Sequence, residues 1–192
     1  MALRDFASTR LGTVVVLAVT TGLILGGLWF VRGRGDDSFS QVTLTGDTSG
    51  AAPVVGQKAA TFATTDMDGE AVDLADLLGQ PVWLIFGATW CPTCRAESAD
   101  IEAVHQTLGD KAQILAIYVD NDSETVRDYA DRLGLTFRQV PDPNTSLGSL
   151  YRIMGVPMHF FIAPDGTIDQ IKIGALSKQA ALDTLTALID QR

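Results

Sequence analysis

Hydrophobic and polar positions divide this chain of 192 residues into an apolar segment, a polar stretch and a patterned body. Residues 11–31 carry no charged side chain. The stretch that follows is rich in Gly, Ser, Thr and Asp, which is typical of a flexible tether, and from about Gln57 short apolar runs alternate with helical spacings. The pattern therefore predicts a tail at 1–10, an apolar helix at 11–31, a linker at 32–56 and one folded domain at 57–192.

The apolar runs of the body predict β-strands. Pro81–Ala88 and Gln113–Val119 are almost continuously apolar, as expected for strands that are buried on both faces. Residues 61–65 and 71–74 flank the turn sequence 66–69, which predicts a β-hairpin. Further strands are expected at 136–140, 160–163 and 167–173.

Helices are predicted between these strands. A helix from Pro92 to Leu108 should stop at Gly109, and its inward face follows spacings of three and four: Cys94, Glu97, Ile101, Val104 and Leu108. Glu97 is the one carboxylate on this apolar stripe. Other helices are expected at 73–78, 124–133 and 146–154 and after a Ser177 cap. This alternation predicts an α/β sandwich around a mixed sheet.

The apolar segment at 11–31 is long enough to cross the hydrocarbon core of a membrane. The rival interpretation is a cleaved signal peptide, whose apolar region usually has about 7–15 residues and precedes an A-x-A-like site. This segment is longer, and residues 28–32 offer no such site. We therefore expect an uncleaved single-pass anchor in contact with membrane lipid, with Trp29 and Phe30 at one interface.

The charge is distributed unevenly along the chain. Residues 1–35 carry a net +3, so the rest must carry −12 to reach the formal net charge of −9. Proteins that bind nucleic acid usually present a basic surface to the phosphates. The acidic body therefore argues against nucleic acid as a partner.

The two cysteines of the chain, Cys91 and Cys94, directly follow a predicted buried strand, in the sequence Trp90-Cys91-Pro92-Thr93-Cys94. At the start of a helix, backbone amides and the helix dipole stabilise a thiolate on the first cysteine. The second cysteine lies close enough to resolve a mixed disulfide. The spacing therefore predicts a redox-active disulfide.

Other uses of two cysteines fit less well. A structural zinc site needs two further ligands, and the two histidines, His105 and His159, are widely separated. Covalent haem attachment needs a histidine after the second cysteine, where this chain has Arg95. An inert disulfide at this spacing would restrict the unfolded chain very little. We therefore expect no metal and no cofactor.

Several of these stretches resemble the membrane-anchored TlpA/ResA-like thiol-disulfide oxidoreductases of the thioredoxin superfamily, within the redoxin (AhpC-TSA) group. The likeness covers residues 54–192 and rests on these stretches: 66–69, 79–82, 86–97, 155–157 and 160–166. It implies a thioredoxin-like fold, in which a central mixed sheet is flanked by helices. The family also implies an N-terminal β-hairpin and an inserted helix and strand, which match 124–140.

The resemblance implies roles for individual residues. Cys91 would be the attacking thiol, Cys94 the resolving thiol and Glu97 the helix carboxylate that accepts a proton. The alternative for Glu97 is a solvated glutamate in the first helical turn, favoured by the dipole. Pro157 would be a cis-proline facing the dithiol. The substrate would contact the following residues: Trp90, Pro92, Val156 and Pro157.

The chain departs from the family pattern at three places. Thioredoxin has a buried aspartate where this chain has Ile85, so proton transfer cannot depend on that position. Gly87 replaces a frequent tryptophan, and Met158-His159 follows Pro157 where small hydroxyl residues are common. We expect His159 to face a neighbour or solvent; its near-neutral pKa is the only argument for a catalytic role. His105 is expected to be structural.

The resemblance implies a membrane-tethered reductase of exported protein disulfides, outside the cytoplasm. Its substrate would be apocytochrome c or another exported dithiol protein, and a membrane thiol donor would restore the dithiol. One rival is a thiol peroxidase, but the pattern Pro-x-x-x-Thr-x-x-Cys is absent whether counted from Cys91 or from Cys94. The other is a thioredoxin-like copper chaperone, but that class has three residues between its cysteines and a distant histidine ligand.

Overall fold

The computed structural model describes residues 10–32 and 52–191. These residues fall in two units of the chain, 1–39 and 40–192, each of which is considered by itself. The tail and most of the linker lie outside the described residues, so both stay predictions.

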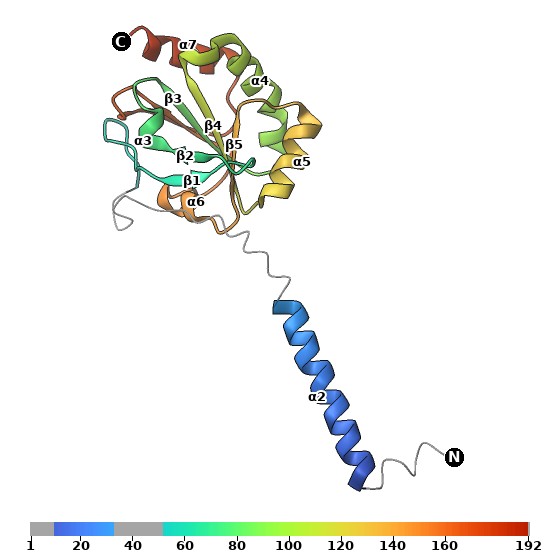
Figure 1. The fold of residues 1–192 in the computed structure, drawn as a ribbon. Helices are drawn as coiled ribbons and strands as arrows, with labels where there is room; N and C mark the ends of the chain where they lie inside the picture. Colours follow the sequence, from blue (N-terminus) through green and yellow to red (C-terminus); the bar gives the residue numbers. More distant parts are fainter. Residues whose placement is uncertain (1–9, 33–51, 192) are drawn as a thin grey trace. The chain divides into compact units, whose positions relative to one another are not determined.

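Helix α2, Arg10–Arg32, forms where the apolar helix was expected (Figure 1). Its side chains are described at 14–27, where they are exposed. Within the described part of the chain, no helix is long and apolar enough to cross a membrane. The membrane anchor at 11–31 therefore stays a prediction.

The second unit is built on a five-stranded mixed sheet with the order β5-β4-β3-β6-β7 (Figure 1). The central strand β3, Val82–Gly87, is buried along its whole length and runs parallel to β4, Gln113–Val119. Strand β5, Arg138–Asp142, extends the parallel part. On the other side, β6, Met158–Ile162, runs antiparallel to β3, and β7, Ile168–Ile173, antiparallel to β6.

Both faces of this sheet are covered. Alternate β3 residues point to opposite sides, as strand geometry requires. Trp83 and Ile85 pack with three helices: α4 (Pro92–Leu108), α5 (Ser123–Leu133) and α7 (Lys178–Ile189). Leu84 and Phe86 pack on the opposite side with α3 (Leu74–Leu77), α6 (Ser146–Leu150) and the hairpin of β1 (Ala63–Thr65) and β2 (Ala71–Asp73). The predicted α/β sandwich and its hairpin are thus confirmed.

Polar caps and glycines set the helix ends. The Asp73 and Asp122 carboxylates accept from the first-turn amides of α3 and α5, and Ser177 caps α7. Helix α4 ends at Gly109, with φ 53°, and continues as a short 3-10 turn, Gly109–Lys111. Gly134, with φ 64°, adopts the left-handed conformation that ends α5.

Strand β5 differs from its predicted bounds of 136–140. It starts at Arg138 and continues through Pro141 to Asp142. An edge strand tolerates proline because fewer of its N–H groups are needed in the ladder. Asp142 is fully buried, and its carboxylate accepts hydrogen bonds from the backbone N–H groups of Leu147 (3.2 Å) and Gly148 (2.9 Å). This contact joins the end of β5 to α6.

Helix α6 is shorter than the predicted 146–154, since it ends at Leu150. The next residue, Tyr151, is buried and packs against Phe62 and Phe86. Its hydroxyl donates to the carbonyl oxygen of Ala60 at 2.7 Å. Packing of this side chain therefore turns the chain out of the helix.

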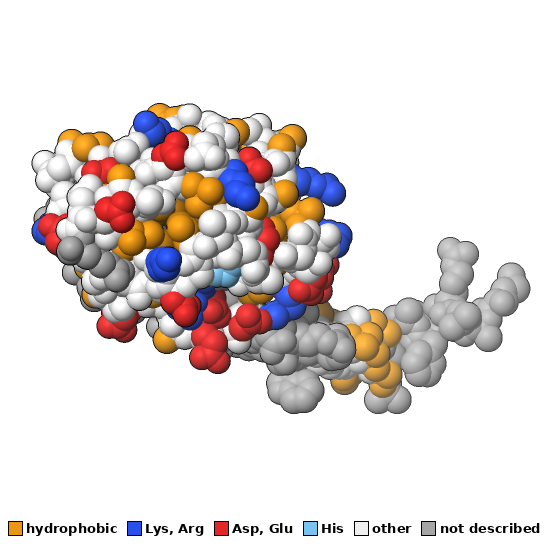
Figure 2. All heavy atoms as spheres, turned by 90° about the horizontal axis from the view of Figure 1, so that it is seen from above, with side chains coloured by type: hydrophobic (Ala, Val, Ile, Leu, Met, Phe, Trp, Pro, Cys, Tyr) orange, Lys and Arg blue, Asp and Glu red, His pale blue; other side chains and the backbone are white. Residues whose placement is uncertain are grey.

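The surface of the folded unit carries mixed charges. Figure 2 looks onto the side formed by α4 and α7 and shows acidic and basic side chains interspersed with small apolar areas. This view presents no broad basic face of the kind that binds nucleic acid.

Candidate active site

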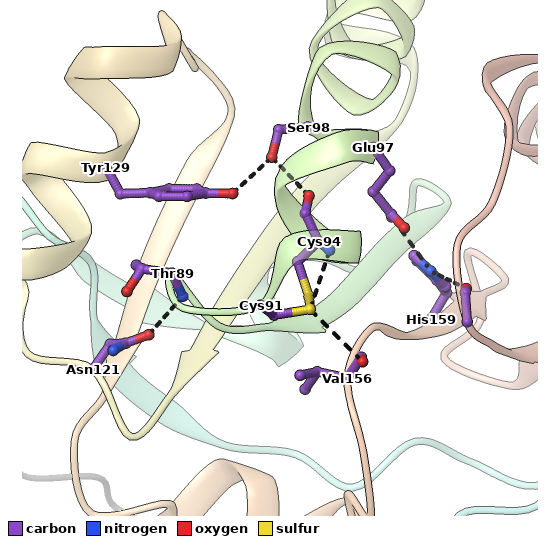
Figure 3. Close-up of a disulfide and its surroundings, with 10 residues drawn as sticks. Thr89, Cys91, Cys94, Glu97, Ser98, Asn121, Tyr129, Val156 and His159 are labelled. Atoms are coloured by element: carbon purple, nitrogen blue, oxygen red, sulfur yellow. Dashed lines mark hydrogen bonds and ion pairs between the residues drawn. A yellow bond between two sulfur atoms is a disulfide. The ribbon is translucent and has the colours of Figure 1, made fainter.

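The dithiol lies where β3 passes into α4, and Cys91 and Cys94 form a disulfide with their Cα atoms 5.3 Å apart (Figure 3). Cys91 is the N-cap of α4, and its Sγ accepts from the backbone N–H of Cys94 at 3.1 Å. Pro92 occupies the first turn of α4, where backbone N–H groups have no partner within the helix, so the N–H that proline lacks costs no hydrogen bond. The turn predicted from the sequence therefore places both sulfur atoms at the start of the helix.

A residue far along the chain holds this turn. The backbone N–H of Thr89 donates to Asn121 Oδ1 at 2.9 Å, and the N–H of Cys91 donates to the carbonyl oxygen of Ala88 at 3.1 Å. Asn121 is nearly buried and follows the carboxyl end of β4, which is parallel to β3. Asn121 was not predicted from the sequence. Its place just after a buried parallel strand was the available signal, because such strand ends meet at one edge of a sheet.

The segment opposite the dithiol contains a cis peptide bond between Val156 and Pro157. The Sγ of Cys91 lies 3.8 Å from the carbonyl oxygen of Val156. The backbone N–H of Gly174 donates to the carbonyl oxygen of Pro157 at 2.9 Å, which ties this segment to the end of β7. The cis-proline expected from the resemblance thus faces the dithiol.

The remaining predicted contact residues lie at the surface beside the disulfide. Trp90 is 63% exposed, and Pro92 is exposed as well. Val156 is half-buried and packs against the cluster formed by Ala88 and the two cysteines. The structure therefore brings Trp90, Pro92, Val156 and Pro157 together around Cys91, and their contact with a substrate stays a prediction.

Glu97 lies one turn after Cys94 on the inward face of α4 and is 5% exposed. Burial raises its pKa to about 7; Asp100 adds to this rise and the backbone amide of Leu176 opposes it. Neither carboxylate oxygen has a partner in ordinary hydrogen-bonding geometry among the described residues. The alternative of a solvated glutamate is therefore wrong. The side chain can change protonation state near neutral pH, as a proton acceptor must.

His159 is fully buried, so the part of the expectation that placed it in solvent is wrong. The reason is the register of the sheet: His159 pairs with Ile85 of the central strand, and its ring packs 5.8 Å from that of Trp83. Its Nε2 lies 3.1 Å from the carbonyl oxygen of Gly174 and 3.4 Å from Glu97 Oε1. Burial lowers the pKa of His159 to about 4, against a smaller opposing effect of Gly174, so the imidazole is neutral at pH 7.

Two hydroxyl groups support the helix behind Cys94. The Ser98 hydroxyl donates to the carbonyl oxygen of Cys94 at 2.9 Å and lies 3.0 Å from the hydroxyl of Tyr129 (Figure 3). Neither residue was predicted from the sequence. Ser98 stands four residues after Cys94, a helical spacing that could have indicated it, whereas Tyr129 on α5 carries no local signal.

A small cavity of about 20 Å³ lies between Cys94 and Glu97, and Ser98 and Tyr129 also line it. This volume is enough for one water molecule. Ile85 lines the same cavity, at the position where thioredoxin has its aspartate. The buried carboxylate nearest the dithiol in sequence is therefore Glu97 on helix α4, and the strand position has Ile85 instead of an aspartate.

In the part of the chain that is described, no three histidine, cysteine, aspartate or glutamate side chains are placed to hold a metal ion together. His105 packs edge-on against Phe137 near the end of α4. This contact fits the structural role expected for it.

Comparison with protein families gives a match to the AhpC/TSA family over residues 55–171, more than half of the chain. The chain is 35% identical over 113 residues to thiol-disulfide oxidoreductase ResA of Oceanobacillus iheyensis, covering 58% of this chain and 59% of that protein. It is 32% identical over 133 residues to ResA of Geobacillus kaustophilus, covering 69% and 76%.

Among solved structures, a candidate thiol:disulfide interchange protein DsbE from Chlorobium tepidum superposes with a TM-score of 0.67 at 25% identity, covering 72% of this chain and 99% of that one. This likeness confirms the thioredoxin-like fold. Together with the family match and the disulfide at the start of α4, it shows that the chain belongs to the AhpC/TSA family and, within it, to the thioredoxin-like thiol-disulfide oxidoreductases.

Proposed function

We propose that this protein is a reductase of disulfides in exported proteins. The thiolate of Cys91 attacks one sulfur of the substrate disulfide, and the other substrate sulfur leaves as a thiolate that takes a proton from water. Cys94 then gives its proton to Glu97 and attacks Cys91 Sγ. The mixed disulfide breaks, the reduced substrate departs and the Cys91–Cys94 disulfide forms, so two electrons pass from the enzyme to the substrate.

One observation carries this proposal: the two cysteines have different surroundings. Cys91 Sγ lies 3.8 Å from the carbonyl oxygen of Val156, in the segment that we expect to bind the substrate. Cys94 faces inward, toward the cavity that Glu97 also lines. A nucleophile beside the expected docking segment and a resolving thiol beside a proton acceptor are the arrangement that this exchange requires.

The proposed substrates are proteins outside the cytoplasm, with apocytochrome c as one candidate class, and a membrane thiol donor would return the enzyme to its dithiol form. Helix α2 supports a membrane location for the enzyme, since 11–31 carry no charge and apolar side chains such as Leu23 and Leu25 are exposed. The similarity to relatives named thiol-disulfide oxidoreductase ResA supports thiol-disulfide exchange as the reaction. We propose that α2 anchors the protein in the cell membrane with its folded unit outside.

The anchor can be tested by fractionation of cells that produce the full chain. The protein should stay with the membrane through washes in high salt and carbonate, and its amino terminus should precede residue 31. Release by salt alone, or a mature protein that begins beyond Val31, would contradict the anchor without affecting the proposed chemistry.

Trapping in the native membrane tests the substrate class. A Cys94→Ser variant lacks the resolving thiol, so it should accumulate mixed disulfides between Cys91 and exported proteins, whereas a Cys91→Ser variant should not. Adducts carried by Cys94 in the Cys91→Ser variant would reverse the assigned roles of the two cysteines, and efficient consumption of hydrogen peroxide with no protein adducts would favour a thiol peroxidase.

A further inference from the structure

His159 connects the buried carboxylate to the segment that faces the dithiol. Its Nε2 lies 3.4 Å from Glu97 Oε1 and 3.1 Å from the carbonyl oxygen of Gly174 (Figure 3). Gly174 in turn donates its backbone N–H to the carbonyl oxygen of Pro157 at 2.9 Å. One buried side chain thus contacts both the proposed proton acceptor on α4 and the residue that holds the Val156-Pro157 segment.

The two oxygen atoms near Nε2 determine which ring nitrogen of the neutral imidazole carries the hydrogen. The carbonyl oxygen of Gly174 can only accept, and a carboxylate oxygen also accepts. A lone pair on Nε2 would face both of them, which is unfavourable, so the neutral ring carries its hydrogen on Nε2. The same N–H is then placed between Gly174 and Glu97, and the Glu97 contact is a long one that can shorten when the carboxyl group ionises.

None of the groups that shift the pKa of Glu97 carries a positive charge. Asp100 on the same helix raises its pKa, Cys94 precedes it by one turn, and the hydroxyl-bearing Tyr118 and Tyr129 line the adjacent cavity. Lys172, the cross-strand neighbour of His159 on β7, is exposed. The Leu176 backbone amide opposes the effect of burial only in part.

We propose that His159 is a positioning residue that holds the Glu97 carboxylate in its proton-accepting form beside Cys94 by donating its Nε2–H. The effect of His159 on turnover rests on the proposed function. The contact between His159 and Glu97 is independent of it. A buried carboxylate that receives a hydrogen bond ionises more readily than one that receives none. His159 would therefore set the pH above which Glu97 can take the Cys94 proton.

The test compares three full-length variants of His159. Leucine removes the donor, glutamine places an amide N–H₂ about where Nε2 lies, and asparagine offers the same amide at a shorter reach. A His105→Leu variant controls for the loss of a histidine elsewhere. Near-UV circular dichroism checks the fold of each variant; if the leucine variant does not fold, the glutamine and asparagine pair carries the comparison.

The first readout is the ionisation of Glu97 in the oxidised protein, followed by ¹³C NMR of labelled glutamate carboxyl groups and assigned with a Glu97→Gln variant. We expect the Glu97 midpoint to rise by about one pH unit in the leucine and asparagine variants and to return toward the native value with glutamine. The second readout is the pH profile of mixed-disulfide resolution in the reduced protein, which should shift by the same amount.

An unchanged Glu97 midpoint in a folded leucine or asparagine variant would overturn the role of His159. If the wild-type protein fails to reduce any protein disulfide, the proposed function is wrong, and the NMR titration still decides whether His159 acts on Glu97. A midpoint that moves equally in the His105→Leu control would also contradict the inference, since the effect would then be general.

Discussion

The Sγ of Cys91 lies 3.8 Å from the carbonyl oxygen of Val156, although the two residues are 65 positions apart in the chain. This contact puts the sulfur of Cys91 against the segment on which an extended substrate chain could lie. A substrate that docks there brings its own disulfide to Cys91 before it can reach Cys94. We infer from this relationship that Cys91 is the attacking thiol.

Cys91 should be the first cysteine to react with an alkylating reagent in the reduced protein. The two side chains are almost equally exposed, at 5% and 6%, so access alone does not separate them. Cys91 differs because the backbone N–H of Cys94 points at its sulfur from 3.1 Å and stabilises a thiolate there. Peptide mapping after brief alkylation below about pH 8.5, the range of a free thiol, should find the label on Cys91. Preferential labelling of Cys94 would reverse the assigned roles.

Replacing Glu97 by glutamine should slow the resolution of mixed disulfides by about 10²-fold, because the proton acceptor for Cys94 is lost. The pKa of Glu97 is raised to about 7, so the carboxylate is available mainly above that pH, and the wild-type rate should rise with pH through this value. The variant should lack that rise. Stopped-flow measurement from about pH 5 to 9 checks it. Identical profiles for the two proteins would show that Glu97 takes no proton from Cys94.

The same substitution should stabilise the folded, oxidised protein at alkaline pH. The pKa of Glu97 is raised from 4.5 to about 7, so its contribution to folding is fully present below pH 4.5 and is lost as pH rises through 7. At alkaline pH the cost to the wild-type protein should approach about 3 kcal/mol. Glu97→Gln avoids this cost, so the oxidised variant should gain stability relative to wild type as pH rises. Urea unfolding of the oxidised proteins at several pH values measures the difference, and a constant difference would contradict the burial of the carboxylate.

Replacing Asn121 by alanine should loosen the turn before Cys91. The backbone N–H of Thr89 would lose its acceptor at 2.9 Å, and a part-buried hydrogen bond of this kind contributes about 0.5–1.5 kcal/mol. We expect a loss of stability in this range and slower reaction of Cys91 with disulfides. The exposed Asn144 provides a matched control, since Asn144→Ala should change neither quantity. Equal behaviour of the two variants would mean that Asn121 does not hold the turn.

Local signals in the sequence were sufficient for much of this fold. Pro92 and Gly109 mark the ends of α4 because one suits the first helical turn and the other the helix terminus. The burial of Glu97 followed from its place on an apolar stripe, and the cis bond at Pro157 from the family resemblance. These features depend on the residues themselves or on a motif that stands in one stretch.

The features that were not predicted from the sequence depend on contacts between distant parts of the chain. His159 is buried because β6 pairs with the central strand, and its partner Gly174 comes from the end of β7. Tyr129 approaches Ser98 from another helix. Strand β5 extends to Asp142 where this carboxylate binds the amides of α6. Each of these arrangements requires the sheet order and register, which residue spacing does not contain.

The most direct measurement of the central claim is a single-turnover reaction of the fully reduced protein with an exported protein that contains one accessible disulfide. The account predicts that the substrate becomes reduced in proportion to enzyme added, that the Cys91–Cys94 disulfide forms, and that Cys94→Ser stops at an adduct on Cys91. A substrate that stays oxidised, or an adduct carried by Cys94 in place of Cys91, would contradict it.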